Sequence, residues 1–277
     1  MFSFCLSMQS PSAGWHDVLH FSALPTLRLP IIFMWQILKI WFANAKVPSI
    51  DAICKILGIG GAQGSAAQRL GKFLLSAEAS CAEKKQQTRK LQGLIECDGT
   101  SIRSWKVPNT TNLCYWQLYG ACEGGHRVVN LYDIRLAISR NFGKPPPESY
   151  SRIASTSFFE DVSYRTDSGQ RTCLISDGAP CYDKIASCTG LLKRSVNHSK
   201  GEFERKERLH NKVISVHTGS IDNVWKMLKG HIPNSVNSKS GGHPNAVIMK
   251  YCRQWQWRYE NASCLDLCKI TAKRFRS

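Results

Sequence analysis

The sequence predicts an α/β protein in which helices precede a sheet. Three observations favour this class. Residues 31–76 carry apolar side chains at helical spacing, short strand-like runs begin at Leu94, and a strand followed by helices completes the chain. With 277 residues, the chain is long enough for one sizeable core and a small accessory domain.

The N-terminal region contains no segment that we expect to cross a membrane. Residues 1–28 have weak periodicity and remain an unassigned leader. The apolar run 29–43 is shorter than a bilayer-spanning helix and is interrupted by Lys39, so it predicts a buried helix. No Lys or Arg precedes Arg28, which does not fit the basic start of a signal peptide.

The glycine-rich turn 58–61 joins two predicted helices in the outline of a helix-turn-helix. Arg69 and Lys72 lie off the apolar stripe of the second helix and are the candidate DNA-binding residues of this region. An ordinary helical hairpin packed on the core fits the same pattern. The polar stretch 77–91 is a helix tail or a linker, so we expect the helical region to cover 29–91.

Four short runs predict strands. They are 94–98, 115–119, 127–132 and 172–176, the first three antiparallel. The segment Glu123-Gly-Gly-His126 indicates a hairpin between the second and third runs. The proline-rich stretch 143–148 suits neither a helix interior nor a central strand, so it predicts a surface loop. A short helix is expected at 182–188, and the remainder is expected to be helical with polar connections.

The charge indicates a polyanionic partner. The chain has 37 Lys and Arg against 20 Asp and Glu, a formal net charge of +17. Nucleic acid is the commonest partner of such a surface, and an anionic membrane is the second. The 12 cysteines are scattered and form no Cys-x-x-Cys pair, so we expect buried thiols in an intracellular protein rather than disulfides or a zinc site.

Asp98 and Asp177 each follow an apolar run and precede a glycine. An acidic group at a strand end lies at the rim of the sheet, where ligands bind in open α/β folds. Two such carboxylates could share a pair of Mg²⁺ or Mn²⁺ ions, which activate the attacking oxygen and stabilise the leaving one. Each Asp-Gly pair also fits a simple turn.

The segment 217–229 predicts an amphipathic helix that carries a third acid. Its apolar stripe is Ile221, Val224, Trp225 and Leu228. Asp222, Lys226 and Lys229 share a neighbouring face, which could offer a carboxylate to a metal and two ammonium groups to phosphate. A plain amphipathic helix with an acidic first turn fits the segment equally.

Five segments in this order resemble the Merlin and ISXO-type insertion-sequence transposases. They are Glu96-Cys-Asp98, Asp177-Gly178 with Tyr182, Val196-Asn-His-Ser199, His217-Thr-Gly-Ser-Ile-Asp-Asn-Val-Trp225 with Lys229, and Trp257-Arg-Tyr-Glu-Asn261. The resemblance implies an RNase H-like catalytic domain, which we expect over 92–262. Three departures from the family stand out. The third acid is Asp222 rather than Glu, Gly219 replaces Asn, and the single Cys5 before Cys54 predicts no N-terminal zinc ribbon.

The resemblance also implies a site and a reaction. Asp98, Asp177 and Asp222 would be the catalytic residues of a DDE site and would hold the Mg²⁺ or Mn²⁺ ions, with Lys229 on phosphate. His217 and His198 would lie beside the site. The implied reaction is attack of water on a phosphodiester at the element end, followed by attack of the freed 3′-hydroxyl on target DNA.

The implied partner is double-stranded DNA, both the element ends and the target. The location would be intracellular and DNA-associated, in the nucleus of a eukaryote or in the cytoplasm or nucleoid of a bacterium. Transposases of this kind usually act as homo-oligomers. Three other functions stay open: a catalytically silent DNA-binding protein derived from a transposase, a nuclease without strand transfer, and a membrane-associated basic protein.

Several basic runs accompany these motifs. They are Lys193-Arg194, Arg205-Lys-Glu-Arg208 and Lys273-Arg-Phe-Arg276, the last within an expected basic tail at 263–277. Such runs fit solvated faces or, beside a DNA-cutting core, contacts with phosphate. The alternating aromatic residues Trp255, Trp257 and Tyr259 fit core packing first and a stacking platform for DNA bases second.

Overall fold

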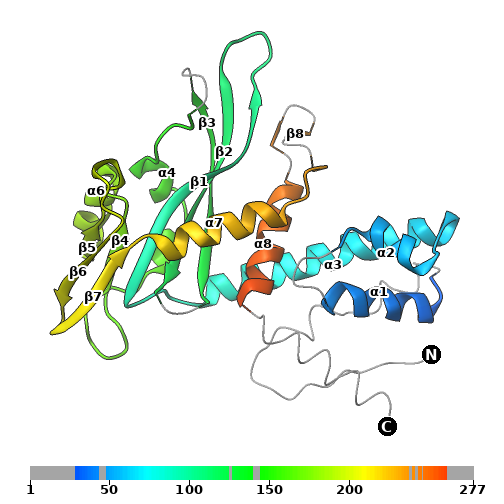
Figure 1. The fold of residues 1–277 in the computed structure, drawn as a ribbon, viewed down its shortest axis with the longest axis horizontal. Coiled ribbons are helices and arrows are strands. Elements are labelled where there is room, and N and C mark those ends of the chain that lie inside the picture. The colour runs from blue at the N-terminus through cyan, green and yellow to red at the C-terminus, as the bar shows by residue number, and fades with distance from the viewer. Residues whose placement is uncertain are drawn as a thin grey trace. The chain divides into compact units, whose positions relative to one another are not determined.

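The structure, a computed structural model, contains two units (Figure 1). It describes residues 29–43, 48–124, 127–139, 144–236, 239–240, 243–244 and 246–260. The first unit consists of the residues up to Lys84 together with those from Arg253 onward, and the second is Lys85–Cys252. The expected leader and basic tail lie outside the described residues, whereas the expected domain boundary at residue 91 falls shortly after the division at Lys84.

Helices form the first unit, as the sequence predicted. They are α1 (Ile31–Ala43), α2 (Ile50–Leu57), the greater part of α3 (Gly61–Thr88) and the end of α8 (Val247–Glu260). Ser49 caps α2 by accepting the Ala52 N–H at 3.1 Å, and Gly58 ends it in the left-handed conformation with φ 64°. Because α3 continues to Thr88, the polar stretch after residue 76 is a helix tail rather than a linker.

The helix-turn-helix outline is present as two packed helices. Helix α3 passes so close to α2 that a Cβ on Gly71 would lie 2.1 Å from Ile50 Cγ1. Ile53, Leu70 and Leu74 fill the core between these helices together with α1. The glycine at position 71 therefore fits a close helix crossing, and α2 and α3 form a compact hairpin.

The second unit is built on a five-stranded mixed sheet with the order β3-β2-β1-β4-β5. Its strands are β1 (Leu94–Lys106), β2 (Leu113–Glu123), β3 (Val129–Ser139), β4 (Cys173–Ser176) and β5 (Leu192–Ser195). The first three are antiparallel neighbours, and β4 and β5 run parallel to β1. Helix α6 (Pro180–Thr189) connects the two parallel strands, which is the crossover that parallel pairing requires. The expected α/β class and the β2–β3 hairpin are thus confirmed.

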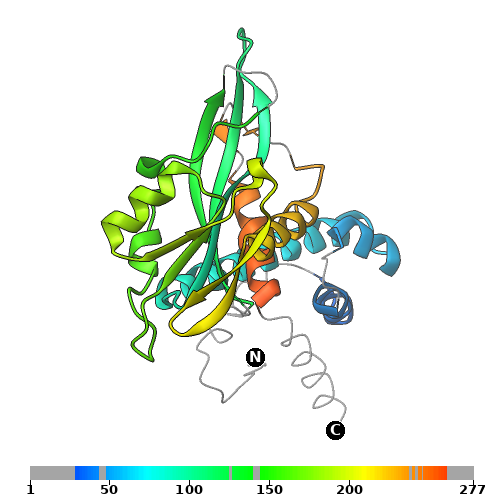
Figure 2. The same cartoon turned by 60° about the vertical axis from the view of Figure 1, so that its left-hand side comes forward.

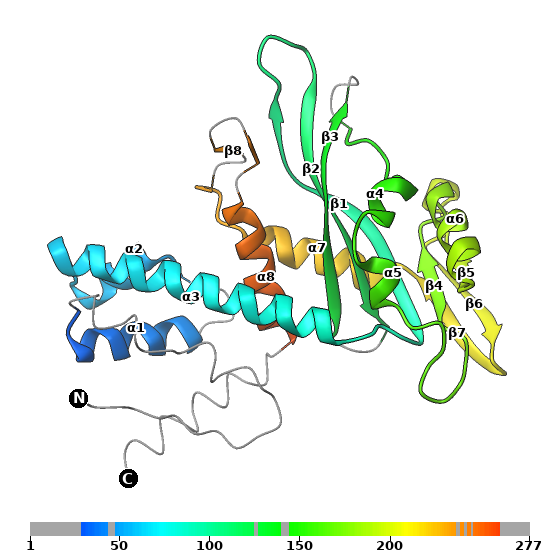
Figure 3. The ribbon, with the colours of Figure 1, turned by 180° about the vertical axis from the view of Figure 1, so that it is seen from behind.

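Helices cover the two faces of this sheet (Figures 1, 2 and 3). On one face, α4 (Tyr150–Ala154), α5 (Phe158–Asp161) and α6 enclose a buried core that includes Tyr119, Phe158 and Tyr182. On the other face, α7 (Gly219–His231) lies across β1 and β2. A short hairpin of β8 (Lys239–Ser240) and β9 (His243–Pro244) precedes α8.

The predicted end of the first strand was wrong. We expected it to stop at Asp98, but β1 continues to Lys106, so Asp98 lies within a paired strand. The partner strands are also longer than expected, and the β1–β2 ladder runs from Ile95–Glu123 to Lys106–Leu113. A register shift between Ser101 and Arg103 breaks the apolar alternation there, which hides the continuation of the strand from sequence reading.

The prediction of a helical C-terminal third was also wrong in part. Besides β5, the strands β6 (Glu204–Leu209) and β7 (Lys212–His217) form an antiparallel hairpin, and only a 3₁₀ turn (η2, His198–Lys200) lies between β5 and β6. The turn residues His210 and Asn211 have φ values of 49° and 62°, the conformation of tight hairpins. Because one face of β6 is charged and exposed, its sequence lacks the apolar alternation that marks a strand.

Two expectations drawn from composition can be compared with the described residues. None of the described helices combines the length and the apolar character that crossing a bilayer requires. Nine cysteines fall within the described residues; all have free thiols, and all but Cys188 are buried. This agrees with the expectation of buried, reduced cysteines.

Candidate active site

The fold brings the three predicted acids of the chain near one another. Asp98 lies in β1, Asp177 follows β4 directly, and Asp222 is in the first turn of α7. Burial first, and then the negative charges of Glu148, Asp177 and Asp222, raise the pKa of Asp98 to about 7. Among the described residues, none of these four carboxylates forms an ion pair. The site is therefore a group of acids without ion pairs among the described residues, although the charge of Arg152 acts on Glu148 and that of Lys229 on Asp98.

Glu148 was missed by the sequence reading, which placed it in a surface loop. Its carboxylate lies over the backbone of Gly99, where a Cβ would be 2.2 Å from Glu148 Oε1. Burial raises the pKa of Glu148, and the charge of Asp177 adds to this effect. The loop is held against β2 because Gln117 donates a hydrogen bond to the Pro146 carbonyl at 2.7 Å. A single acid after three prolines carries no periodic signal, so the sequence offered no means of finding it.

Glu96, which belongs to the first of the five sequence motifs, fixes the start of α7. Glu96 lies two residues before Asp98, on the same face of β1, and is 3% exposed. Its Oε2 accepts the N–H groups of Ser220 at 2.8 Å and Ile221 at 3.1 Å. No side chain of the residue before α7 caps the helix, so Glu96 satisfies these orphan donors and places a negative charge at the positive end of the helix.

We expect Glu96→Ala to destabilise the sheet unit by about 2–4 kcal/mol, since one buried and one partly buried N–H group lose their acceptor. Glu96→Gln should recover much of this loss, because its amide oxygen can still accept, and should lose only the charge–dipole part. Urea unfolding of both variants measures the difference. Glu204→Ala, which removes an exposed carboxylate from β6, is the control. Equal stability of the Glu96→Ala and Glu204→Ala proteins would contradict this role of Glu96.

A tryptophan of α7 contacts the first acid. Trp225 Nε1 donates a hydrogen bond to Asp98 Oδ2 at 3.0 Å. The ring lies over Gly120, which is the residue directly opposite Asp98 in the β1–β2 ladder. Together with the contact of Glu96, this bond attaches α7 to β1 at two points. The position of Asp222 on that helix is set accordingly.

Histidine and threonine side chains surround Asp222. Thr218 Oγ1 donates to Asp222 Oδ2 at 3.2 Å, so His198 Nε2, also 3.2 Å from Thr218 Oγ1, must be a donor. His217 Nδ1 accepts the Gly219 N–H at 3.1 Å and lies 3.5 Å from Glu96 Oε1. His198 therefore contacts Thr218, the hydrogen-bond partner of Asp222, and His217 contacts Gly219 and Glu96. Asp222 itself is exposed.

Asp177, the second acid, makes a turn contact and also acts on the other acids of the site. Asp177 Oδ1 accepts the Ala179 N–H at 3.0 Å, which is the Asx-turn contact that an Asp-Gly pair favours. Gly178 has φ 85°, a backbone conformation that suits glycine. The charge of Asp177 nevertheless acts on Asp98 and on Glu148. The two interpretations of this motif therefore do not exclude one another.

The two lysines of α7 differ in their surroundings. Burial lowers the pKa of Lys229, while the charge of Asp98 opposes that shift, so the ammonium group lies within reach of the acid's field. Both lysines are exposed, and Lys226 forms no hydrogen bond or ion pair among the described residues. Only Lys229 is therefore placed toward the carboxylates.

The acids have the ligand chemistry that a divalent cation needs, but their side chains are not arranged to share one. Their carboxylate oxygens are hard ligands of the kind that Mg²⁺ prefers, and no cation within the described ranges forms an ion pair with them. In the part of the chain that the structure describes, however, no three His, Cys, Asp or Glu side chains are grouped so that they could hold one metal ion. The acids are close enough for their charges to interact, but their side chains would have to rearrange to bind one metal ion together.

The candidate DNA contacts of the helical unit are on one helix. Arg69 and Lys72 are both exposed on α3, in the turns that follow the glycine-rich junction with α2. Among the described residues, neither forms an ion pair or a hydrogen bond. Their ammonium and guanidinium groups are consequently available to phosphate.

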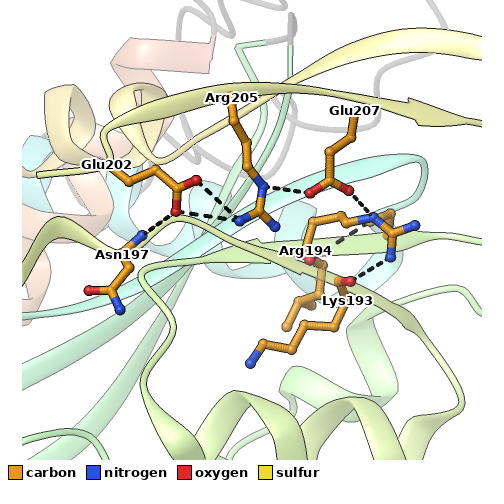
Figure 4. Close-up of polar contacts among 8 residues, drawn as sticks. Lys193, Arg194, Asn197, Glu202, Arg205 and Glu207 are labelled. Atoms are coloured by element: carbon orange, nitrogen blue, oxygen red, sulfur yellow. Dashed lines mark hydrogen bonds and ion pairs between the residues drawn. The ribbon is translucent and has the colours of Figure 1, made fainter. Parts of the chain in front are cut away.

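The basic runs near the sheet divide into paired and unpaired residues. Arg194 and Arg205 both pair with Glu207 at 2.5 Å, and Arg205 also reaches Glu202 at 3.3 Å (Figure 4). Glu202 in turn accepts the Asn197 N–H at 3.1 Å, so this network holds the loop that carries His198.

The opposite face of β6 carries unpaired cations. Lys206 and Arg208 alternate with Arg205 and Glu207, are exposed, and form no hydrogen bond or ion pair within the described ranges. Arg194 and Arg205 have structural partners, whereas Lys206 and Arg208 are free to contact phosphate.

The alternating aromatic residues near the C-terminus lie on a helix. Trp255 is 6% exposed and stacks on Tyr259, with ring centroids 4.9 Å apart, and Trp257 is half-buried. All three lie on α8. The stacked pair supports core packing as the main role of these side chains.

No protein-family model, no characterised protein and no solved structure matches the chain. The resemblance to Merlin and ISXO-type transposases therefore rests on the sequence motifs alone.

Proposed function

We propose that the chain is a DDE-type transposase that cuts DNA phosphodiester bonds with Mg²⁺ or Mn²⁺ and joins the 3′ end to target DNA. The observation that supports this most is the convergence of Asp98, Asp177 and Asp222, which are far apart in the sequence. The charges of the other two act on Asp98, and no cation of the described protein pairs with any of the three. Like charges near a partly buried carboxylate such as Asp98 are costly unless protons or cations compensate them.

The arrangement of the sheet supports an RNase H-like identity of the second unit. Three consecutive antiparallel strands are followed by parallel strands added on the free side of β1. This is the arrangement expected of an RNase H-like domain, in which the first acid lies on the first strand and the second follows the fourth. The positions of Asp98 and Asp177 agree with that pattern.

The residues of the chain would bind and orient the DNA and the cations. Asp98 and Asp177 offer carboxylate oxygens from adjacent strands, and Glu96 and Trp225 hold α7 so that Asp222 lies beside them. Lys229 places an ammonium group near Asp98, where it would attract a phosphate. Bound divalent cations would supply the Lewis acidity that activates water and stabilises the leaving oxygen.

The basic groups of the chain fit a DNA substrate. Lys206 and Arg208 on β6, and Arg69 and Lys72 on α3, are exposed and without partners among the described residues. Each such contact with DNA phosphate contributes to affinity through the release of counterions.

A second candidate function is that of a DNA-binding protein that has lost its catalysis. The observations that favour it are the exposed, shorter third acid and the absence of a metal-holding group of three side chains among the described residues. Asp222 Oδ2 is bonded to Thr218, and an aspartate has one methylene fewer than the glutamate usual in the family, so it reaches less far toward Asp98.

The third acid provides the test that separates these functions. We expect Asp222→Ala to abolish Mg²⁺- or Mn²⁺-dependent nicking and joining of a labelled duplex, and Asp222→Glu to retain or increase both. Cleavage by Asp222→Ala at the wild-type rate would show that Asp222 is not part of the catalytic site. If the wild-type protein binds DNA without nicking it and Asp222→Glu nicks, the chain is a silent descendant. Nicking without joining of a 3′-hydroxyl end would identify a simple nuclease.

A further inference from the structure

The β6–β7 hairpin separates its charged side chains onto two faces. Successive side chains of a strand point to opposite sides. Arg205 and Glu207 lie on one face of β6, and Figure 4 shows both directed toward β5, where Glu207 pairs with Arg194. Lys206 and Arg208 lie on the opposite face, which we call the outer face. The outer face also carries Glu204 of β6 and the cross-strand residues Val213 and Ser215 of β7.

The carboxylates of the hairpin have partners that leave the outer cations free. Glu207, on the side of β5, is held by two arginines. Glu204, the one carboxylate of the outer face, accepts the Ser215 hydroxyl at 2.6 Å. Lys206 and Arg208 are exposed and form no hydrogen bond or ion pair in the described part of the chain. The outer face therefore presents two positive charges that no described carboxylate contacts.

The side chains of the outer face fit the phosphate backbone of a duplex better than two other anionic partners. Proteins that bind single-stranded nucleic acid stack its bases on aromatic rings, and the five residues of this face include no aromatic side chain. Attachment to a membrane surface relies on an apolar face beside the charges. Here Val213, which is 67% exposed, is the single apolar side chain of the five. Two cations without stacking groups suit contact with phosphate.

The hairpin belongs to the same unit as the acids, and its second strand leads to α7. Strand β7 ends at His217, and Asp222 lies in the first turn of the helix that begins at Gly219. The hairpin is also tied to the loop before it, because Glu202 accepts the Asn197 N–H at 3.1 Å and pairs with an arginine of β6. A duplex on the outer face would thus be held by the strand that leads to the third acid.

We infer that the outer face of the β6–β7 hairpin is a binding surface for double-stranded DNA, on which Lys206 and Arg208 contact phosphates independently of base sequence. The inference rests on the proposed function in taking DNA as the partner, but it requires neither a bound metal nor cleavage. It gives the sheet unit a contact with the duplex of its own, separate from Arg69 and Lys72 of the helical unit.

The experiment measures binding of the full chain to a labelled DNA duplex by fluorescence anisotropy in EDTA, from about 50 mM to about 200 mM salt. The test variant is Lys206→Gln/Arg208→Gln. The matched control, Lys106→Gln/Arg127→Gln, removes the same charge from the same unit. Both control residues are exposed and lack hydrogen bonds and ion pairs within the described ranges. Circular dichroism and urea unfolding show whether each variant is folded.

We expect the test variant to reduce the slope of log affinity against log salt by about 2, since each lost phosphate contact removes about 0.9. Its affinity near 0.1 M salt should fall about tenfold or more, and equally for two duplexes of unrelated sequence. The control variant should stay close to the wild type. The same loss in both variants would mean that net charge alone attracts DNA, and the inference would be overturned.

Other outcomes separate this inference from the proposed function. If the wild type binds DNA and the test variant binds it with the same affinity and slope, the outer face is not a DNA surface and the proposed function stands. If the test variant loses DNA binding and the wild type never nicks, the inference stands without the catalytic function. If the wild type binds no DNA, both fail. Loss of binding only to vesicles of phosphatidylcholine and phosphatidylserine would identify a membrane surface and overturn the inference.

Discussion

Asp98→Asn is expected to make the protein more stable than the wild type above about pH 7. The pKa of Asp98 is about 7 in the folded protein, against 3.8 for an ordinary aspartate. Because the folded value lies above the unfolded one, the protonated acid is favoured by folding, and stability falls as the pH rises from about 4 to about 7. The full shift corresponds to at most about 4 kcal/mol, and relaxation of the side chains will reduce it.

Asparagine is neutral, and its amide oxygen can still accept the Trp225 N–H, so it should remove the repulsion without losing the hydrogen bond. Urea unfolding at pH 5 and pH 8 measures the effect. The wild type should lose stability between these values, and Asp98→Asn should lose less. Asp183→Asn, at an exposed acid on α6, serves as the control. Parallel pH profiles for Asp98→Asn and the wild type would show that the folded protein does not penalise the charge of Asp98.

Glu78→Ala is expected to destabilise the helical unit by about 3–5 kcal/mol, the usual result of removing one partner of a buried ion pair. Glu78 is 3% exposed on α3, and Arg258 Nη2 of α8 lies 2.8 Å from its Oε1. Its Oε2 accepts hydrogen bonds from Trp41 at 3.2 Å and from Gln254. Burial raises the pKa of Glu78, and the charge of Arg258 opposes this shift.

The control for this prediction is Glu83→Ala, which removes an exposed glutamate from the same helix. Thermal unfolding of both variants, followed by circular dichroism, shows whether the helical signal is lost at a lower temperature. Glu78→Ala should lower the midpoint by many degrees and Glu83→Ala by little. Similar midpoints for both variants would mean that the Glu78 contacts contribute little to the stability of the three helices.

The helices and the acids of the sequence motifs could be predicted from the sequence for a physical reason. Residues 217–229 have clear helical periodicity because α7 buries one face, and residues 31–43 form an apolar run too short to span a bilayer. Asp98 and Asp177 followed apolar runs that are completely or largely buried in adjacent strands. The class of the fold and the candidate acids could therefore be predicted before the structure was known.

The features that escaped prediction depend on contacts between distant segments. The end of β1 is set by pairing with β2, and the β6 strand has a charged outer face that resembles a loop in sequence. Glu148 approaches the site because its loop folds back over Gly99. Trp225 was placed correctly in an apolar stripe, but its bond to Asp98 depends on the register that places Gly120 opposite that acid. No local pattern carries such information.

The most direct test of the central claim is nicking of a labelled DNA duplex by the wild type and by Asp98→Asn over a titration of Mg²⁺ and Mn²⁺. Nicking should require the cation, and Asp98→Asn should lower it at least about a hundredfold, since even groups that only orient metal ligands have effects of that order. Asp183→Asn should nick as the wild type does. Cation-dependent nicking by Asp98→Asn at the wild-type rate would contradict the assignment of Asp98, and with it the proposed DDE site.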